Sequence, residues 1–147
     1  MIIKTLIDAK YHDPEIHILS DSKSEAVETL AERIAVAVND DIAAIAPNGD
    51  KCMISGFDIV RFYADGAKVM AEANGQKYSI ARKLYELEAD LDSKLFFRIS
   101  KSEIINLKRI KRLDMSITGT IKVIMKDGSE SYTSRRNVAK LKQVLGL

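Results

Sequence analysis

The sequence has few of the residues that build disulfide frameworks and metal centres. Its 147 residues include a single cysteine, Cys52, and two histidines, His12 and His17, in one N-terminal segment. One cysteine excludes an intramolecular disulfide and a Cys-x-x-Cys metal site, and no histidine or second cysteine lies near it in sequence to activate the thiol. We therefore expect Cys52 to be buried and inert, and we expect neither a metal nor another cofactor.

Long apolar runs and catalytic signatures are also missing. No stretch approaches the roughly 20 apolar residues that cross a membrane. The start, MIIKTLIDAKYHD, is too acidic and too short in its apolar run for a secretory signal. The sequence contains no GxxxxGK(S/T), GxGxxG, GxSxG or HExxH motif. We expect a cytoplasmic protein that is not an enzyme.

Each part of the chain is poor in charge of one sign, although the net charge is only +2. Residues 1–93 contain 10 Lys and Arg against 17 Asp and Glu, whereas residues 94–147 contain 13 against 4. Such segregation favours a nucleic-acid surface in the C-terminal part, with an acidic remainder that limits indiscriminate binding. A solvated basic face without a ligand is the alternative.

The N-terminal segment has the pattern of a small β-α-β extension. IIKTLID (2–8) and EIHIL (15–19) have the composition of two short strands, and the Ser-x-x-Glu spacing at Ser22 predicts the start of an amphipathic helix that ends near Asn39. A unit of this size cannot bury its own apolar faces. We expect residues 1–41 either to pack on the main domain or to mediate dimerisation, and the residues leave both alternatives open.

The remainder, residues 42–147, alternates short apolar runs with turn signals such as Asn-Gly and Asp-Gly. This pattern predicts a mostly antiparallel α+β fold. Candidate strands are 42–46, 51–54, 58–63, 67–73, 76–80, 95–99, 110–117, 120–126 and 129–133. One helix interrupts them at ARKLYELEADL, where we expect Leu84, Leu87 and Leu91 to enter the core.

Two basic segments stand out in this part of the chain. FFRISKSEIINLKRIKRL (96–113) has the pattern of a strand, a basic loop and a second apolar run. In YTSRRNVAKLKQVL (132–145) a polar turn leads into a helix, with Ser134 as the expected N-cap. Arg135 and Arg136 then occupy the first turn, where the helix dipole disfavours cations and a bound phosphate would offset the effect.

The order F-F-R-I-x-K-S-x-I-I-N, then a β hairpin, then S-R-R-x-V-x-x-L resembles the LytTR family of bacterial DNA-binding transcription regulators, over roughly residues 42–147. The resemblance implies an elongated antiparallel β domain whose loops, and not a recognition helix, enter successive major grooves of double-stranded DNA. It also implies a homodimer on repeated sites and, for a short member, control by a membrane-protein partner. Glu103 departs from the aromatic or aliphatic residue common at its position.

Carried over residue by residue, the resemblance implies three contact regions: the loop after Ile99, the start of the last helix, and the hairpin from Asp65 to Lys68. Lys101 matches a base-contacting position of the family and Arg136 aligns best with its DNA-contacting arginine, and both could reach the O6 and N7 acceptors of guanine. Further cations would neutralise phosphates. The expected DNA-binding residues are Lys68, Arg98, Lys101, Ser102, Asn106, Lys108, Arg109, Lys111, Ser134, Arg135, Arg136, Asn137 and Lys140.

Several alternatives remain open for these residues and for the function. Ser102 and Asn106 could brace the loop by binding backbone groups, and Arg98 could pair with an acidic neighbour such as Glu103. An RNA-binding module is the nearest rival function, although the basic region has few aromatic residues to stack bases. A third possibility is an interaction protein whose basic face binds an acidic partner or an anionic membrane surface.

Overall fold

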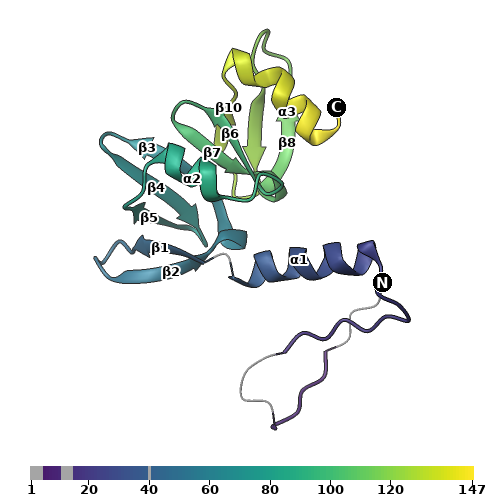
Figure 1. Cartoon of the computed structure of the whole chain (residues 1–147). Helices are drawn as coiled ribbons and strands as arrows, with labels where there is room; N and C mark the ends of the chain where they lie inside the picture. The colour runs from purple at the N-terminus through teal and green to yellow at the C-terminus, as the bar shows by residue number, and fades with distance from the viewer. Residues whose placement is uncertain (1–4, 11–14, 40) are drawn as a thin grey trace. The chain divides into compact units, whose positions relative to one another are not determined.

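Two antiparallel sheets and three α-helices form the regular structure of residues 5–10, 15–39 and 41–147, which are those that the computed structural model describes (Figure 1). The chain divides into two units, residues 1–36 and residues 37–147. No helix in the described ranges is long and apolar enough to cross a membrane.

The N-terminal unit contains helix α1 (Glu25–Asn39) and no strand among its described residues. The predicted strands at 2–8 and 15–19 are therefore wrong for 5–8 and 15–19, while 2–4 lie outside the described residues. The reason is burial: an apolar run forms a stable strand only when one face is covered. Leu6 and Ile7 are 93% and 97% exposed.

Helix α1 begins two residues later than its Ser-x-x-Glu signal, with Ser22 as the N-cap, indicates. Its cap is Ser24, whose Oγ accepts a hydrogen bond from the Val27 amide at 3.3 Å. The hydroxyl of Ser22 instead donates to the carboxylate of Asp21. The predicted N-cap is wrong because a second serine lies two residues further on and reaches the free amides of the first turn. The helix ends at Asn39, as predicted.

The larger sheet has seven strands in the order β2-β1-β5-β4-β3-β7-β6, all pairs antiparallel. Its strands are β1 (Asp41–Ile45), β2 (Lys51–Ser55), β3 (Ile59–Asp65), β4 (Lys68–Ala73), β5 (Gln76–Ile80), β6 (Phe96–Ser100) and β7 (Glu103–Asn106). Strand β7 lies where the sequence predicts a basic loop. It forms because Ile104 packs into one hydrophobic cluster and Ile105 into another.

The smaller sheet has the order β10-β9-β8. Its strands are β8 (Ile110–Asp114), β9 (Lys122–Met125) and β10 (Glu130–Tyr132). The first ends three residues earlier than predicted, because the Asp114 carboxylate accepts from the amide of Ser116 and turns the chain. The remaining elements are helices α2 (Leu84–Asp90) and α3 (Val138–Leu145) and the 3₁₀ turns η1 (Gly56–Asp58), η2 (Leu107–Arg109) and η3 (Arg135–Asn137).

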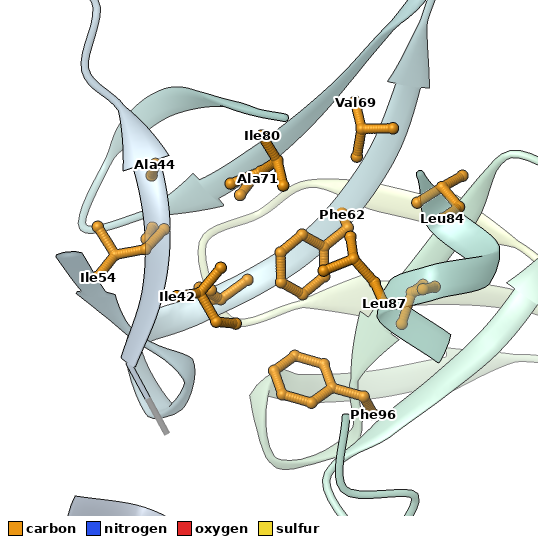
Figure 2. Close-up of a cluster of buried hydrophobic side chains, with 13 residues drawn as sticks. Ile42, Ala44, Ile54, Phe62, Val69, Ala71, Ile80, Leu84, Leu87 and Phe96 are labelled. Carbon is orange, nitrogen blue, oxygen red and sulfur yellow. The ribbon is translucent and has the colours of Figure 1, made fainter. Parts of the chain in front are cut away.

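Residues 37–147 have two hydrophobic clusters. Figure 2 shows the first, in which Phe62 of β3 and Phe96 of β6 lie near Leu84 and Leu87 of α2. The centroids of the two phenylalanine rings are 5.6 Å apart. The leucines of α2 are core residues, as predicted, and Leu91 packs partly against them. The second cluster joins the large sheet to the small sheet and α3. Its buried members are Val60, Ile99, Ile105, Ile121, Val123, Met125 and Leu141.

A partly buried ion-pair network accompanies the second cluster. The guanidinium of Arg61 donates to Glu72 Oε2 at 2.7 Å and to Glu103 Oε1 at 3.0 Å, within the large sheet. It also donates to the backbone carbonyl of Glu130, in the small sheet, at 3.3 Å. Burial alone would lower the pKa of Arg61, but the hydrogen bonds and charges of the two carboxylates raise that pKa above its ordinary value.

We expect Arg61→Met to lower the free energy of unfolding by roughly 3–5 kcal/mol, because the substitution leaves Glu72 and Glu103 buried without their shared cation. Urea denaturation followed by circular dichroism measures the change. The control is Arg82→Met: the side chains of Arg82 and its partner Asp90 are 43% and 65% exposed, so solvent screening limits the loss to about 1 kcal/mol or less. Equal losses would mean that the Arg61 network does not stabilise the fold.

Candidate nucleic-acid interface

The turn between β6 and β7 consists of two residues, Lys101 and Ser102. The carbonyl oxygen of Ser102 accepts a hydrogen bond from the Ala64 amide of β3 at 2.8 Å. Strand β3 then continues into a tight hairpin between the paired residues Asp65 and Lys68. The first two contact regions in chain order, the hairpin and the turn, therefore lie at the same end of the large sheet.

The third region is held at this end by hydrogen bonds to β6. The amide of Ser134 donates to the Ile99 carbonyl at 3.0 Å, and Asn137 Nδ2 donates to the carbonyls of Arg98 and Ile99 at 3.0 and 3.3 Å. Two extended residues span about 7 Å, so the backbones of Ser134 and Lys101 are on the order of 10 Å apart. Segments separated by more than thirty positions in the sequence thus form one surface.

Four cations project from this surface, which we call the turn end. They are Lys68, Lys101, Arg135 and Arg136. All four side chains are exposed, and within the described ranges none of them has an ion-pair partner. Gly119, in the loop between β8 and β9, lies beside the side chain of Arg135 at ordinary van der Waals distance. A β-carbon there would lie 3.7 Å from Arg135 Nε.

Arg98, a predicted contact, uses its donors within the protein. Its guanidinium donates to the carbonyls of Ser100, at 2.7 Å, and of Lys101, and it pairs with Glu88 of α2 at 3.1 Å. The alternative that Arg98 pairs with an acidic residue therefore describes it, but the partner is Glu88 and not Glu103, whose carboxylate binds Arg61. Arg98 therefore fixes the backbone of the turn from which Lys101 projects.

Asn106 is 0% exposed, so the structure contradicts the expectation of a direct DNA contact. Its Nδ2 donates to the Ile59 carbonyl at 2.8 Å, and its Oδ1 accepts from the Lys108 amide at 2.9 Å. Asn106 therefore braces the loop, which is the alternative that the sequence left open, because both ends of its amide bind backbone groups. Ser102, in contrast, is exposed, and its amide donates to the Ser100 hydroxyl at 3.3 Å.

The last helix begins differently from the prediction. Arg135–Asn137 form the 3₁₀ turn η3, and α3 starts only at Val138. Ser134 makes no side-chain cap, and its Oγ is buried without a hydrogen-bond partner among the described residues. The two arginines accordingly precede the α-helix, and Lys140 lies exposed on its first turn.

The remaining predicted cations lie at the other end of β7. Lys108 and Arg109 belong to η2, which follows the last residue of the strand, and Lys111 follows at the start of β8. Four residues of β-strand, about 13 Å, separate them from the turn end. The structure therefore does not bring all the predicted contacts together.

Arg109 has protein partners, as Arg98 has. Its guanidinium donates twice to the Phe57 carbonyl, at 3.1 and 2.8 Å, and lies 5.0 Å from the centroid of the Phe57 ring. It also contacts Asp58 Oδ1 at 3.4 Å.

The sequence did not point to a neighbouring cation, Lys126, whose backbone amide donates to the Arg109 carbonyl at 2.8 Å. The Asp-Gly turn signal at residues 127 and 128 marks its hairpin, but the register follows only from the structure.

Exposed cations at the strand ends of a β-rich domain form a surface that suits a polyanion such as the phosphate backbone of a nucleic acid. The family model for the LytTr DNA-binding domain matches residues 40–146, and the chain belongs to this family. Its fold is mostly antiparallel β structure with three helices, an α+β arrangement.

Known proteins resemble the chain in fold and in sequence. A solved LytTr DNA-binding domain from Bacillus cereus has a TM-score of 0.70 and 19% identity, and the match covers 74% of this chain and 99% of that one. Two uncharacterized HTH-type transcriptional regulators, from Staphylococcus aureus strains NCTC 8325 and COL, are each 36% identical over 95 residues. These matches cover 65% of this chain and 64% of the length of each relative.

Proposed function

We propose that this chain is a sequence-specific regulator of transcription that binds double-stranded DNA through the turn end. The observation that carries the proposal is the convergence of the hairpin, the β6–β7 turn and η3, each of which presents exposed cations without an ion-pair partner among the residues that the structure describes. Membership of the LytTr DNA-binding domain family supports it. The regulators from Staphylococcus aureus that match in sequence support the role in transcription.

The side chains of the turn end divide into two roles in this proposal. Lys101 and Arg136 reach base edges in the major groove, where a guanine presents O6 and N7 as acceptors. Lys68, Arg135 and Lys140 neutralise phosphates beside them and set the register of the protein on the duplex, with the hydroxyl of Ser102 as a further donor.

The cations at the far end of β7 add contacts to the backbone of a neighbouring part of the duplex. Lys108, Lys111 and Lys126 are exposed and have no ion-pair partner within the described ranges. Arg109 contributes charge, but its donors are bound to η1. Arg98, Asn106 and Asn137 shape the surface from within the protein.

The N-terminal segment has a separate role in the proposal: residues 1–41 mediate homodimerisation and residues 42–147 bind DNA. The described residues of this segment leave Leu6, Ile7 and Leu19 more than 90% exposed, which is unusual unless a partner covers them. We further propose a cytoplasmic protein without enzymatic activity. Control by a membrane-protein partner rests on the family resemblance alone.

Salt dependence tests the electrostatic part of the proposal. If about six phosphates are neutralised, affinity for duplex DNA should fall roughly a thousandfold between 50 and 200 mM salt, because bound counterions are released. Fluorescence anisotropy on a duplex selected from random sequences measures the fall. Single-stranded RNA serves as competitor, and its binding more tightly than the selected duplex would favour the RNA-binding alternative.

Two substitutions separate base contacts from phosphate contacts. Arg136→Ala should cost roughly 1–3 kcal/mol on the selected duplex and relax preference at one base position. Lys111→Ala, its matched control at the far end of β7, should weaken binding to all sequences alike and flatten the salt slope by about one unit. Both affinities are measured on the selected and on a scrambled duplex. If Arg136→Ala binds every sequence as well as the parent chain, the role assigned to this arginine is wrong.

Sedimentation tests the role of the N-terminal segment. We expect the full chain to sediment as a dimer and a shorter chain that starts at Asp41 to sediment as a monomer, because the shorter chain lacks the exposed apolar side chains. Analytical ultracentrifugation over a range of concentrations measures both masses. The same number of protomers per particle in the two chains would remove the dimerisation role.

A further inference from the structure

The two segments that carry the proposed base contacts belong to different sheets. Lys101 precedes β7 of the large sheet, and Arg136 follows β10 of the small sheet (Figure 1). Base discrimination requires both side chains to meet their acceptors at the same time, so the position of one sheet on the other must be fixed. The contacts that fix it decide how sharply the domain can discriminate.

Glu103 connects these segments directly. It is the residue after the β6–β7 turn, and its Oε1 accepts a hydrogen bond of 2.6 Å from the hydroxyl of Ser131 in β10. The same oxygen accepts from Arg61 at 3.0 Å. Ser131 is 1% exposed and lies three residues before Ser134, where the η3 turn begins. A single carboxylate oxygen thus joins the start of β7 to the strand that leads into the arginines.

The chemistry of this contact makes it strong. Hydrogen bonds to a charged group are shorter and roughly twice as strong as those between two neutral groups. The amide of Ser134 makes a neutral bond to the Ile99 carbonyl, and Asn137 makes two more. The side chain of Glu103 is only 13% exposed, so water does not compete well for its carboxylate.

We infer that Glu103 and Ser131 form a positioning clamp that sets the η3 arginines relative to the β6–β7 turn and so determines base discrimination, an inference that rests on the proposed function. Glu72 provides a matched comparison, because it is the other carboxylate bound to Arg61, at 2.7 Å, and lies within the large sheet. The clamp therefore depends on Glu103 and not on Glu72, although both neutralise the same cation.

The test compares Glu103→Gln, Ser131→Ala and Glu72→Gln in the full chain. Affinity is measured for a duplex selected by the parent chain and for a scrambled duplex. We expect the two clamp variants to lose about tenfold in the ratio of the two affinities while affinity for the scrambled duplex stays unchanged. Glu72→Gln should keep the parent ratio. An equal loss in Glu72→Gln, or an unchanged ratio in both clamp variants, would overturn the inference.

A second measurement needs no DNA and separates the clamp from the proposed function. The amide of Ser134 is hydrogen-bonded to β6, so its hydrogen exchange, measured by NMR, reports on the attachment of η3. We expect faster exchange at Ser134 in both clamp variants than in Glu72→Gln, after correction for global stability. If Glu103→Gln fails to fold, Ser131→Ala carries the comparison. If the parent chain prefers no duplex over another, the proposed function is wrong. If the Ser134 amide exchanges at the same rate in all three variants, the positioning clamp is wrong, whatever the DNA measurements give.

Discussion

The guanidinium of Arg61 is the interaction on which the arrangement of residues 37–147 depends. It lies where the large sheet meets the small one, with its side chain only 19% exposed, and it binds carboxylates of β4 and β7 and a carbonyl of β10. Apolar packing alone would hold the two sheets together but would not fix the position of one sheet relative to the other, because the hydrophobic effect is not directional. Charged hydrogen bonds with defined partners fix the register, and the cost of breaking one of them is high.

This constraint explains how a β-rich domain can present a precise surface without a recognition helix. Strands β3, β6 and β7 are hydrogen-bonded neighbours in the large sheet, and the turns after β3 and β6 consist of two residues each, so side chains at these strand ends have well-defined starting points. Lys101 and Arg136 remain exposed at such ends, where a long cationic side chain keeps its charged head in water.

Residues of one chemical type serve different purposes in this domain. Arg98 and Arg109 satisfy backbone carbonyls of turns, whereas Arg135 and Arg136 have no ion-pair partner within the described ranges. An amide side chain in a basic segment can also serve the interior of the protein: Asn106 is wholly buried. A count of positive charge along the chain cannot separate these groups, because the partners of Arg109 lie more than fifty positions away.

The sequence by itself determined the class of the fold, most strand positions, the leucine core of α2 and the family, because alternating apolar residues, turn dipeptides and paired motifs are local signals. It did not determine β7, whose two isoleucines enter different cores, or the N-terminal segment, where Leu6, Ile7 and Leu19 stay exposed. Only the tertiary structure decided which cations are free and which side chains meet, as Glu103 meets Ser131 across twenty-eight positions. The physical reason is that burial and hydrogen-bond partners depend on segments distant in the chain, while local patterns record only periodicity and turn chemistry.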